Sequence, residues 1–326
     1  MGNQGVLFSV IASYQIGTGH LIRCLNIAEH LGGAPVFFCI DGDENLSSFF
    51  IRDRRIEVFK PERLSRLRPK VVVVDRLEVE PNLLLPFKEI GAEIILLDNL
   101  SGWEMADVVI NALPHPPSQH PVPDGVKIFE GPHYICLSRE ILQARENPRA
   151  IRKAVSKILV TCGGSDPYGL TLKLAKALVQ LPDLPFTTFI LGRIFKERKK
   201  LEEIIQGAPA SVIQDPLSLA PSMVEADMAL TSFGLTVYEV ACLGLPAIIL
   251  PPTKDHCQRA EVFAKYGAAI NLRLNEEVST EKIAEEIQRL RFNPKLRREM
   301  SQAGQRLVDG RGAIRVAQII LELLKD

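Results

Sequence analysis

The chain has 326 residues, of which 46% are hydrophobic and 24% are charged, a composition typical of a globular protein with about two domains. Lys and Arg together number 39, as do Asp and Glu, so charge gives no case for binding nucleic acid or an anionic membrane surface. No apolar run reaches the roughly 18 residues of a membrane span. The N-terminal MGNQG lacks the features of a secretory signal, and we expect a cytoplasmic protein.

The six cysteines form no CxxC pair, and most lie inside apolar runs. They indicate buried thiols in a reducing cytoplasm instead of a disulfide framework or a zinc site. The sequence also lacks HxH and HExxH spacings and clustered carboxylates. We therefore expect no catalytic metal bound by the protein and no other cofactor.

In the first half, apolar runs of strand length alternate with segments of helical period. Strands are predicted at 6–12, 35–40, 71–75, 92–98 and 107–112, and helices at about 19–31 and 82–91. Runs rich in Val and Ile without polar alternation suit strands that are buried on both faces, as in a parallel sheet covered by helices. The proline-rich stretch LPHPPSQHPVPDG (113–125) closes this half and predicts a loop or linker.

The second half follows the polar connection ARENPRAIRK (144–153) and repeats the alternation. Strands are predicted at 157–161, 185–192, 226–232 and 246–251, and helices at 234–244 and 256–267. The final segment, VAQIILELLKD (316–326), has helical period and could pack back across either half, such as on the N-terminal domain. We predict two doubly wound, Rossmann-like α/β domains, 1–150 and 151–326.

Both halves begin with an apolar strand, a glycine-rich turn and a helix. The turns are Gly17-Thr18-Gly19-His20 and Gly163-Gly164-Ser165-Asp166. Glycines permit a tight turn and the close approach of a ligand, and the free N–H groups of the following helix favour an anion. Neither turn matches the GxGxxG or Walker pattern. Together they indicate an interdomain cleft at the carboxyl ends of the strands.

A third glycine-rich turn, SFGLTVYE, runs from Ser232 to Glu239. In a structural interpretation, Ser232 or Thr236 caps the next helix and Glu239 completes a capping box. In a functional interpretation, backbone N–H groups hold a diphosphate while Glu239 accepts hydrogen bonds from two ribose hydroxyls.

Three further residues have both a structural and a functional interpretation. His20 is a cap, a packed side chain or a catalytic base. Asp75 and Asp98 each end an apolar strand, where they cap the next element or belong to the site that gathers at strand ends.

Four segments then occur in a recognisable order: IGTGHLIRCLNIAEHL, LVTCGGSDPYGLTLKLAKAL, TSFGLTVYEVACLGLPAIIL and VDGRGAIRVAQII. Over nearly the whole chain, this series resembles the nucleotide-sugar hydrolases of pseudaminic acid biosynthesis and their spore-coat polysaccharide relatives. More distantly, the third segment resembles the donor site of the UDP-N-acetylglucosamine transferase of peptidoglycan synthesis. The resemblance implies a GT-B architecture, in which two Rossmann-like domains have the active site between them.

The hydrolases of this family remove UDP from UDP-2,4-diacetamido-2,4,6-trideoxy-β-L-altropyranose, and their catalytic histidine lies in the GxGH motif, here at His20. The resemblance implies inverting hydrolysis, with His20 as general base and Asp75 as a second catalytic residue. The implied nucleotide site comprises Gly163, Gly164, Ser165, Ser232, Gly234, Leu235, Thr236 and Glu239. Ile213, and more weakly Val212, would contact uracil from a loop. The implied sugar and phosphate side comprises Gly17, Gly19, Asp98 and Gln258, a residue close to His256.

The chain departs from this family in its first half. Hydrolases of the family often carry Arg and Asp on the first strand, where this chain has Ser9 and Ile11. After Asp75 they often have an aromatic residue or a histidine, where this chain has Arg76 and Leu77. The nucleotide half matches better, so a UDP-sugar remains the expected substrate.

Two alternatives accompany the hydrolase. One is a glycosyltransferase of cell-surface or spore-coat polysaccharide synthesis, in which His20 deprotonates an acceptor hydroxyl. The other is a sugar-nucleotide-binding protein without catalysis, against which the retained GTGH motif argues.

Overall fold

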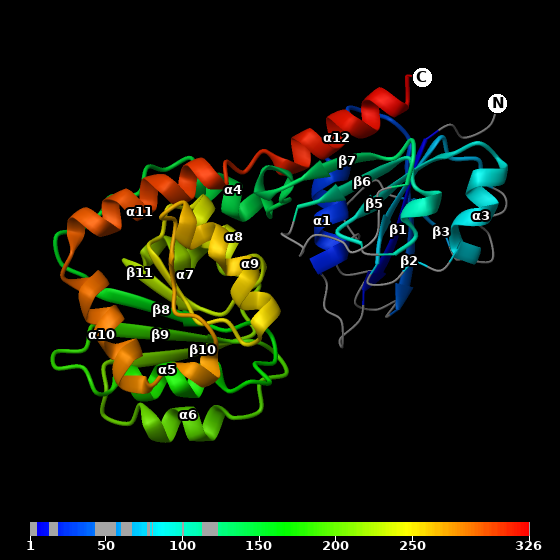
Figure 1. Ribbon diagram of the computed structural model, residues 1–326. Coiled ribbons are helices and arrows are strands. Elements are labelled where there is room, and N and C mark those ends of the chain that lie inside the picture. The colour runs from blue at the N-terminus through cyan, green and yellow to red at the C-terminus, as the bar shows by residue number, and fades with distance from the viewer. Residues whose placement is uncertain are drawn as a thin grey trace. The chain divides into compact units, whose positions relative to one another are not determined.

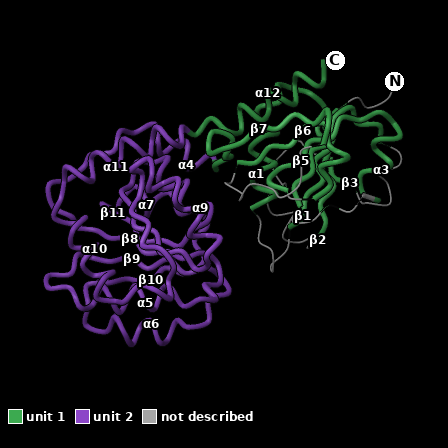
Figure 2. Tube along the Cα trace, in the orientation of Figure 1, with its two compact units in different colours: residues 1–138, 310–326 green, residues 139–309 purple. Residues whose placement is uncertain are grey.

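The computed structural model describes residues 5–12, 19–42, 57–59, 67–76, 79, 81–99, 101–112 and 123–325. The chain forms two compact units, residues 1–138 with 310–326 and residues 139–309 (Figure 1; Figure 2). Each unit is an α/β domain built on a parallel sheet, and the predicted fold class is confirmed.

The described sheet of the first unit has the strand order β3-β2-β1-β4-β5-β6-β7, with every neighbouring pair parallel. Its strands are β1 (Val6–Ala12), β2 (Val36–Gly42), β3 (Glu57–Phe59), β4 (Val71–Asp75), β5 (Glu93–Leu97), β6 (Val108–Asn111) and β7 (Lys127–Glu130). Strand order reverses between β1 and β4, which is the switch point where doubly wound folds bind ligands. Our prediction ended this sheet at residue 112, but β7 extends it and β3 adds a strand at the other edge.

Helices cover both faces of this sheet. Because successive side chains of a strand point to opposite faces, the unit has one apolar core on each face. On one face, α1 (Gly19–Ala28) and α12 (Gly312–Leu323) pack against apolar side chains of β1 such as Phe8 and Val10. On the other face, α3 (Pro81–Glu89) and η2 (Trp103–Met105) cover the alternate side chains. A short turn, η3 (Pro132–Tyr134), packs on α12.

Helix α12 joins the first unit although it follows the second unit in the chain. Its buried hydrophobic side chains are Ala313, Val316, Ala317 and Ile320, spaced as one face of a helix. This face packs into the core on the α1 side of the sheet.

The second unit has the parallel strand order β10-β9-β8-β11-β12-β13, so its switch point lies between β8 and β11. Its strands are β8 (Lys157–Thr161), β9 (Phe186–Leu191), β10 (Ala210–Gln214), β11 (Met228–Thr231), β12 (Ala247–Ile249) and β13 (Ile270–Asn271). Its helices are α4 (Arg139–Arg145), α5 (Leu170–Leu178), α6 (Arg198–Ile204), α7 (Ala220–Glu225), α8 (Leu235–Cys242), α9 (Lys254–Lys265), η4 (Asn275–Glu277), α10 (Thr280–Arg291) and α11 (Pro294–Leu307).

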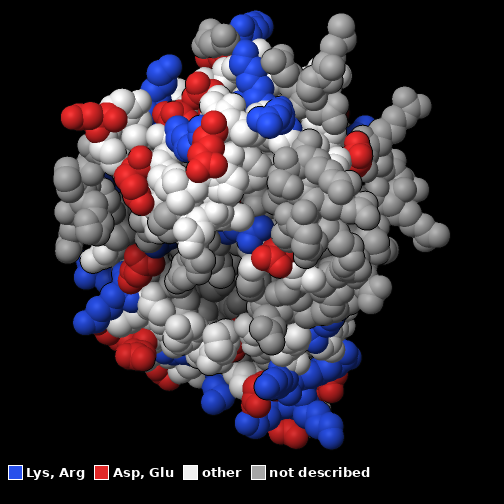
Figure 3. Space-filling model, turned by 90° about the vertical axis from the view of Figure 1, so that its right-hand side faces the viewer, with Lys and Arg blue, Asp and Glu red and all other residues white. Residues whose placement is uncertain are grey.

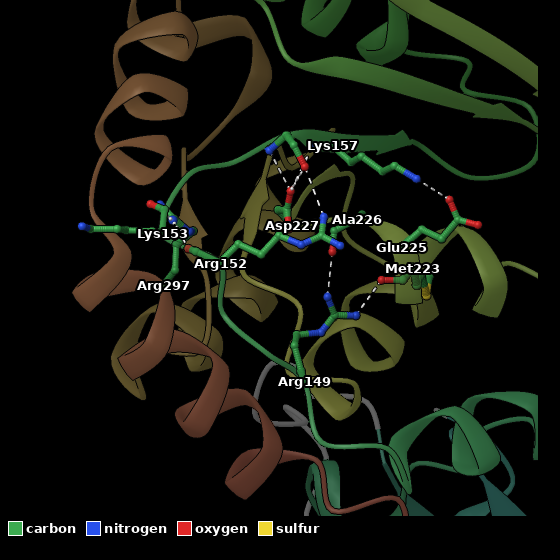
Figure 4. Close-up of polar contacts among 10 residues, drawn as sticks. Arg149, Arg152, Lys153, Lys157, Met223, Glu225, Ala226, Asp227 and Arg297 are labelled. Carbon is green, nitrogen blue, oxygen red and sulfur yellow. Dashed lines mark hydrogen bonds and ion pairs between the residues drawn. The ribbon is translucent and has the colours of Figure 1, made fainter.

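Two arginines fix the beginning of the second unit to the ends of helices, where carbonyl groups lack intrahelical partners. Arg149 donates from Nε, Nη1 and Nη2 over 2.6 to 3.0 Å, as Figure 4 shows in part. The carbonyl acceptors are those of Met223, Ala226 and Leu243 for Arg149, and those of Cys242, Gln305 and Val308 for Arg145. These contacts explain why the unit begins at Arg139, whereas we had expected the boundary at residue 150.

Charges of both signs occur together on the surface. In Figure 3, the basic side chains at the lower edge have acidic side chains among them. On α6, Arg198 pairs with Glu202 at 2.8 Å, and Lys200 pairs with Glu197 just before the helix at 2.5 Å. Within the described residues, every helix is too short or too polar to cross a lipid bilayer.

Candidate functional site

The first candidate site lies at the switch point of the first unit, where α1 begins and β4 ends. Nδ1 of His20 lies 2.6 Å from Oδ1 of Asp75. Because a carboxylate only accepts, Nδ1 carries the proton and Nε2 is the acceptor nitrogen. The His20 side chain is 21% exposed, whereas Asp75 is fully buried. The exposed part of the pair is therefore the imidazole.

Arg23, one turn after His20 on α1, holds the same carboxylate. Its Nε donates to Oδ2 of Asp75 at 2.7 Å and its Nη2 donates to Oδ1 at 2.6 Å, while Nη1 pairs with Asp98. Such a bidentate fork gives a guanidinium–carboxylate pair a fixed geometry. It also leaves the carboxylate one defined orientation toward His20.

Opposing effects set the pKa values of Asp75 and Arg23. Burial by itself raises the pKa of Asp75, but the Arg23 guanidinium and hydrogen bonds from His20 and Arg23 outweigh it and lower that pKa. Burial likewise lowers the pKa of Arg23, but Asp75 and Asp98 together hold it well above its usual value. Asp75 is therefore a carboxylate at neutral pH.

This arrangement can perform base chemistry. A carboxylate on Nδ1 orients an imidazole and stabilises the imidazolium that forms when Nε2 takes a proton. Within the described residues, the partners of the Asp75 carboxylate are side chains of α1.

The thiols of Cys24 and Cys136 lie close to the charged side chains of Asp75, Arg23 and Asp98. Sγ of Cys24 lies 3.6 Å from Oδ2 of Asp75. Burial raises the pKa of Cys24, and it raises the pKa of Cys136 to about 12. Both remain thiols at neutral pH, and neither supplies a nucleophilic thiolate. The six cysteines form no disulfide, and only Cys257 is more than slightly exposed.

The second candidate site lies at the switch point of the second unit. Gly163 and Gly164 follow β8, and Ser232 and Gly234 follow β11. A Cβ atom placed on Gly163, Gly164 or Gly234 would meet no described atom within 4 Å, so these backbone segments border open space. Gly163 also has a φ of 88°, which favours glycine.

Gly192 supports this second site, although the motif analysis did not single it out. A Cβ atom at Gly192 would lie 2.1 Å from the carbonyl oxygen of Gly164. The end of β9 therefore needs glycine so that the Gly163–Gly164 turn can pack against it. The available signal was a glycine at the end of the predicted strand 185–192.

The two helices that begin at this switch point differ at their N-termini. Asp166 accepts from the N–H groups of Leu170 at 2.9 Å and Thr171 at 2.7 Å, so the expectation that this helix offers free N–H groups is wrong for these two. In contrast, α8 begins after Gly234 with no side-chain cap and no acidic residue in its first turn. The capping-box interpretation of Ser232 to Glu239 is therefore wrong. The N-terminus of α8 is the better of the two for an anionic ligand.

Glu239 lies one turn further along α8. Burial alone raises its pKa to about 7, with no contribution from a neighbouring cation or hydrogen-bond donor. Glu239 is partly exposed, and among the described residues no donor to its carboxylate offsets the loss of hydration. A ligand that brings hydroxyl groups would supply those donors.

The remaining predicted residues differ in position. Gly19 begins α1 and borders open space among the described residues, whereas Gly17 lies outside the described residues. Gln258 is exposed on α9. Val212 and Ile213 lie on edge strand β10, not in the loop that we expected, and Ile213 is 39% exposed. Ser165 follows the Gly163–Gly164 turn, and Leu235 and Thr236 are the first two residues of α8.

No group of three or more His, Cys, Asp or Glu side chains in the described part of the chain is arranged to hold a metal ion. The expectation that the protein needs no metal or cofactor stays a prediction.

Comparisons with known proteins agree on the fold. A model of the glycosyltransferase family 28 C-terminal domain matches residues 218–311. The spore coat polysaccharide biosynthesis protein SpsG of Bacillus subtilis (strain 168) is 30% identical over 330 residues, covering 96% of each chain. MurG of Acinetobacter baumannii superposes with a TM-score of 0.70 at 18% identity, over 98% of this chain and 99% of MurG.

A second solved structure, of Anabaena HepE in complex with UDP and glucose, superposes with a TM-score of 0.65. It is 12% identical and covers 99% of this chain and 100% of HepE. With two parallel α/β domains and these structural neighbours, the predicted GT-B fold is confirmed.

Proposed function

Because the chain belongs to the family of the spore coat polysaccharide biosynthesis protein SpsG, we propose that it is an enzyme that hydrolyses a UDP-sugar and releases UDP. The observation that carries this proposal is the His20–Asp75 pair at the switch point of the first unit. The resemblance to hydrolases of pseudaminic acid biosynthesis supports a diacetamido-trideoxyhexose as the sugar.

In the proposed reaction, a water molecule attacks the anomeric carbon of the sugar. The water oxygen bonds to that carbon while the bond from the carbon to the phosphate oxygen breaks, and the electron pair leaves with UDP. Nε2 of His20 takes a proton from the water, and Asp75 stabilises the resulting imidazolium. This single displacement inverts the anomeric configuration, and His20 then returns its proton to solvent.

The second unit would hold the nucleotide. The diphosphate would lie over the Gly163–Gly164 turn and the N-terminus of α8, where backbone N–H groups stabilise the charge that develops on the leaving group. Glu239 would accept hydrogen bonds from the ribose hydroxyls, which supply the donors that its carboxylate lacks among the described residues.

A second candidate function is glycosyl transfer, which the match to the glycosyltransferase family 28 C-terminal domain favours. In that reaction, the hydroxyl of an acceptor sugar replaces water, and His20 takes its proton. A protein that only binds nucleotide sugars would not need a buried carboxylate and an arginine to orient an exposed histidine.

The test is UDP release from UDP-sugars, the diacetamido-trideoxyhexose derivative included, with and without acceptor glycans. We expect release without acceptor and a loss of at least about 100-fold in His20→Ala, the range for removal of a general base. His30→Ala is the matched control, because His30 is exposed beyond the end of α1. Release that requires an acceptor supports the transferase. UDP binding without turnover in either condition refutes both enzymatic proposals.

A further inference from the structure

Arg76 forms a second polar cluster at the carboxyl edge of the first sheet. It directly follows Asp75, and its Nε donates to Oγ of Ser9 at 3.1 Å while its Nη1 donates to Oδ2 of Asp41 at 3.0 Å. The Arg76 side chain is 13% exposed, Ser9 is fully buried and Asp41 is 57% exposed. The cluster therefore leads from the protein interior to solvent at the strand ends.

This cluster and the His20–Asp75 pair lie on opposite faces of the same edge. Asp75 binds side chains of α1, on one face of the sheet. Ser9 and Asp41 alternate with Phe8 and Phe38, which pack toward α1, so they belong to the α3 face. In the sheet register, Val10 pairs with Asp75 and Ile11 pairs with Asp41, so the two groups flank the end of β1, each one strand spacing from it.

The position of Arg76 is fixed from its backbone as well. Nδ2 of Asn99, which is fully buried, donates to the Arg76 carbonyl oxygen at 2.8 Å. Oδ1 of Asn99 in turn accepts from the backbone N–H and hydroxyl of Ser101. Ser9 therefore holds Nε of Arg76, and Asn99 holds its backbone carbonyl group. This fixes the direction of the outer guanidinium N–H groups before a ligand binds, which reduces the entropy lost on binding.

The charge of the cluster indicates what it can recognise. A lone arginine suits phosphate or carboxylate, but Arg76 is already paired with Asp41, so the two together are neutral. Between them they offer guanidinium N–H donors and a carboxylate acceptor. A neutral planar amide, with one carbonyl oxygen and one N–H group, complements that donor and acceptor.

We propose that Arg76 and Asp41 recognise an N-acylamino substituent of the sugar, with Arg76 donating to its carbonyl oxygen and Asp41 accepting from its N–H group. This inference rests on the proposed function and assigns to Arg76 and Asp41 the recognition of one group of its sugar. Ser9 is a positioning residue that orients the guanidinium. Where related hydrolases often have Arg and Asp on the first strand, this chain brings the two charges from the ends of β4 and β2.

The test compares UDP, UDP-glucose and UDP-N-acetylglucosamine by titration calorimetry with the full chain. The two sugars differ at one ring substituent, a hydroxyl against an acetamido group. We expect UDP-N-acetylglucosamine to bind at least about 10-fold more tightly than UDP-glucose. UDP-glucose has no amide at this position, so it would leave the polar groups of the site without their partners. Asp41→Asn and Arg76→Met should reduce that ratio to below about threefold and leave UDP affinity unchanged.

Matched controls come from the same sheet and its flanking residues. Arg68→Met removes an exposed arginine that precedes β4, and Glu57→Gln removes an exposed carboxylate on β3. Both should keep the native ratio. Asp41 is more than half exposed, so Asp41→Asn tests the idea even if Arg76→Met fails to fold.

The outcomes separate the two proposals. Equal affinity of the native protein for both sugars overturns the inference, as does a folded Asp41→Asn or Arg76→Met protein that keeps the native ratio. If the native protein binds none of the three ligands, the proposed function itself fails and the inference fails with it. UDP binding without discrimination between the sugars overturns the inference alone.

Discussion

Asp75 is the residue whose replacement tests the geometry of the first site most directly. Asp75→Asn keeps the size of the side chain but removes the charge and one of the two acceptor oxygens. Arg23 would keep Asp98 as a partner, whereas His20 would lose the carboxylate that orients it. We therefore expect an effect on both stability and activity.

The expected loss of stability is about 3 kcal/mol, at the lower end of the range for removing one partner of a buried ion pair. The lower end applies because Asp98 still neutralises part of the Arg23 charge. Asp107→Asn is the matched control: Asp107 pairs with Lys88 in the same unit, and each side chain is 32% exposed. Its loss should be at most about 1 kcal/mol, because this pair is partly exposed and the asparagine oxygen can still accept from the Ile94 N–H group.

Trp103 makes the measurement specific to the first unit. It is the only tryptophan of the chain, and it is 8% exposed in η2. Its fluorescence during urea unfolding reports the free energy of unfolding of this unit. Activity should fall even when it is measured under conditions in which the variant is fully folded, because an unoriented imidazole is a poor base.

The dependence on pH provides an independent check. The pKa of Asp75 is lower in the folded protein than its ordinary value, so its stabilising contribution is present above that ordinary value of about 3.9. The contribution is lost as pH falls through the lowered folded pKa. The difference between native protein and Asp75→Asn should thus be constant near neutral pH and shrink only in acid. A variant that unfolds within about 1 kcal/mol of the native protein, like the exposed-pair control, would refute the buried-pair reasoning.

Three further predictions concern the second unit. Since burial raises the pKa of Glu239 to about 7, UDP affinity should rise about tenfold between about pH 6 and about pH 8 as the carboxylate forms. Glu239→Gln should lack this rise. Titration of the diphosphate affects both proteins equally, so it cannot produce a difference between them. If UDP affinity depends on pH in the same way in both proteins, the role assigned to Glu239 is wrong. Gly192→Ala should lower both thermal stability and UDP affinity, because its Cβ would meet Gly164 at 2.1 Å. Gly164→Ala faces open space and should reduce UDP affinity alone; if UDP binds it normally, the diphosphate does not lie at this turn.

The sequence predicted the elements whose apolar runs are buried on both faces, such as β1, β4 and β8. It missed β3 and β7 because these edge strands are short and carry exposed polar residues. It also placed the domain boundary too late. The contacts that tie Arg145 and Arg149 to distant helix ends involve residues far away in the chain, and composition does not show them.

At the site, residue type and spacing singled out His20 and Asp75 but not the residues that hold them. The signal for Arg23 was its i, i+3 spacing from His20, which puts both side chains on one face of α1. The GGSD turn predicts an anion site at the free N–H groups of the following helix, with no role given to the Asp166 carboxylate. That carboxylate instead binds the helix N-terminus, an outcome that depends on the φ of 44° at Asp166.

The place of α12 in the first unit has a consequence for synthesis on the ribosome. Residues 139–309 are a continuous segment and can complete their own core as soon as they have emerged. The first 138 residues emerge earlier, but the face of their sheet that carries α1 stays only partly covered until α12 follows. At about 5 to 20 residues per second, that wait lasts on the order of 10 s or more. The unit that is made first is therefore finished last, and its apolar β1 face needs protection from aggregation during that interval.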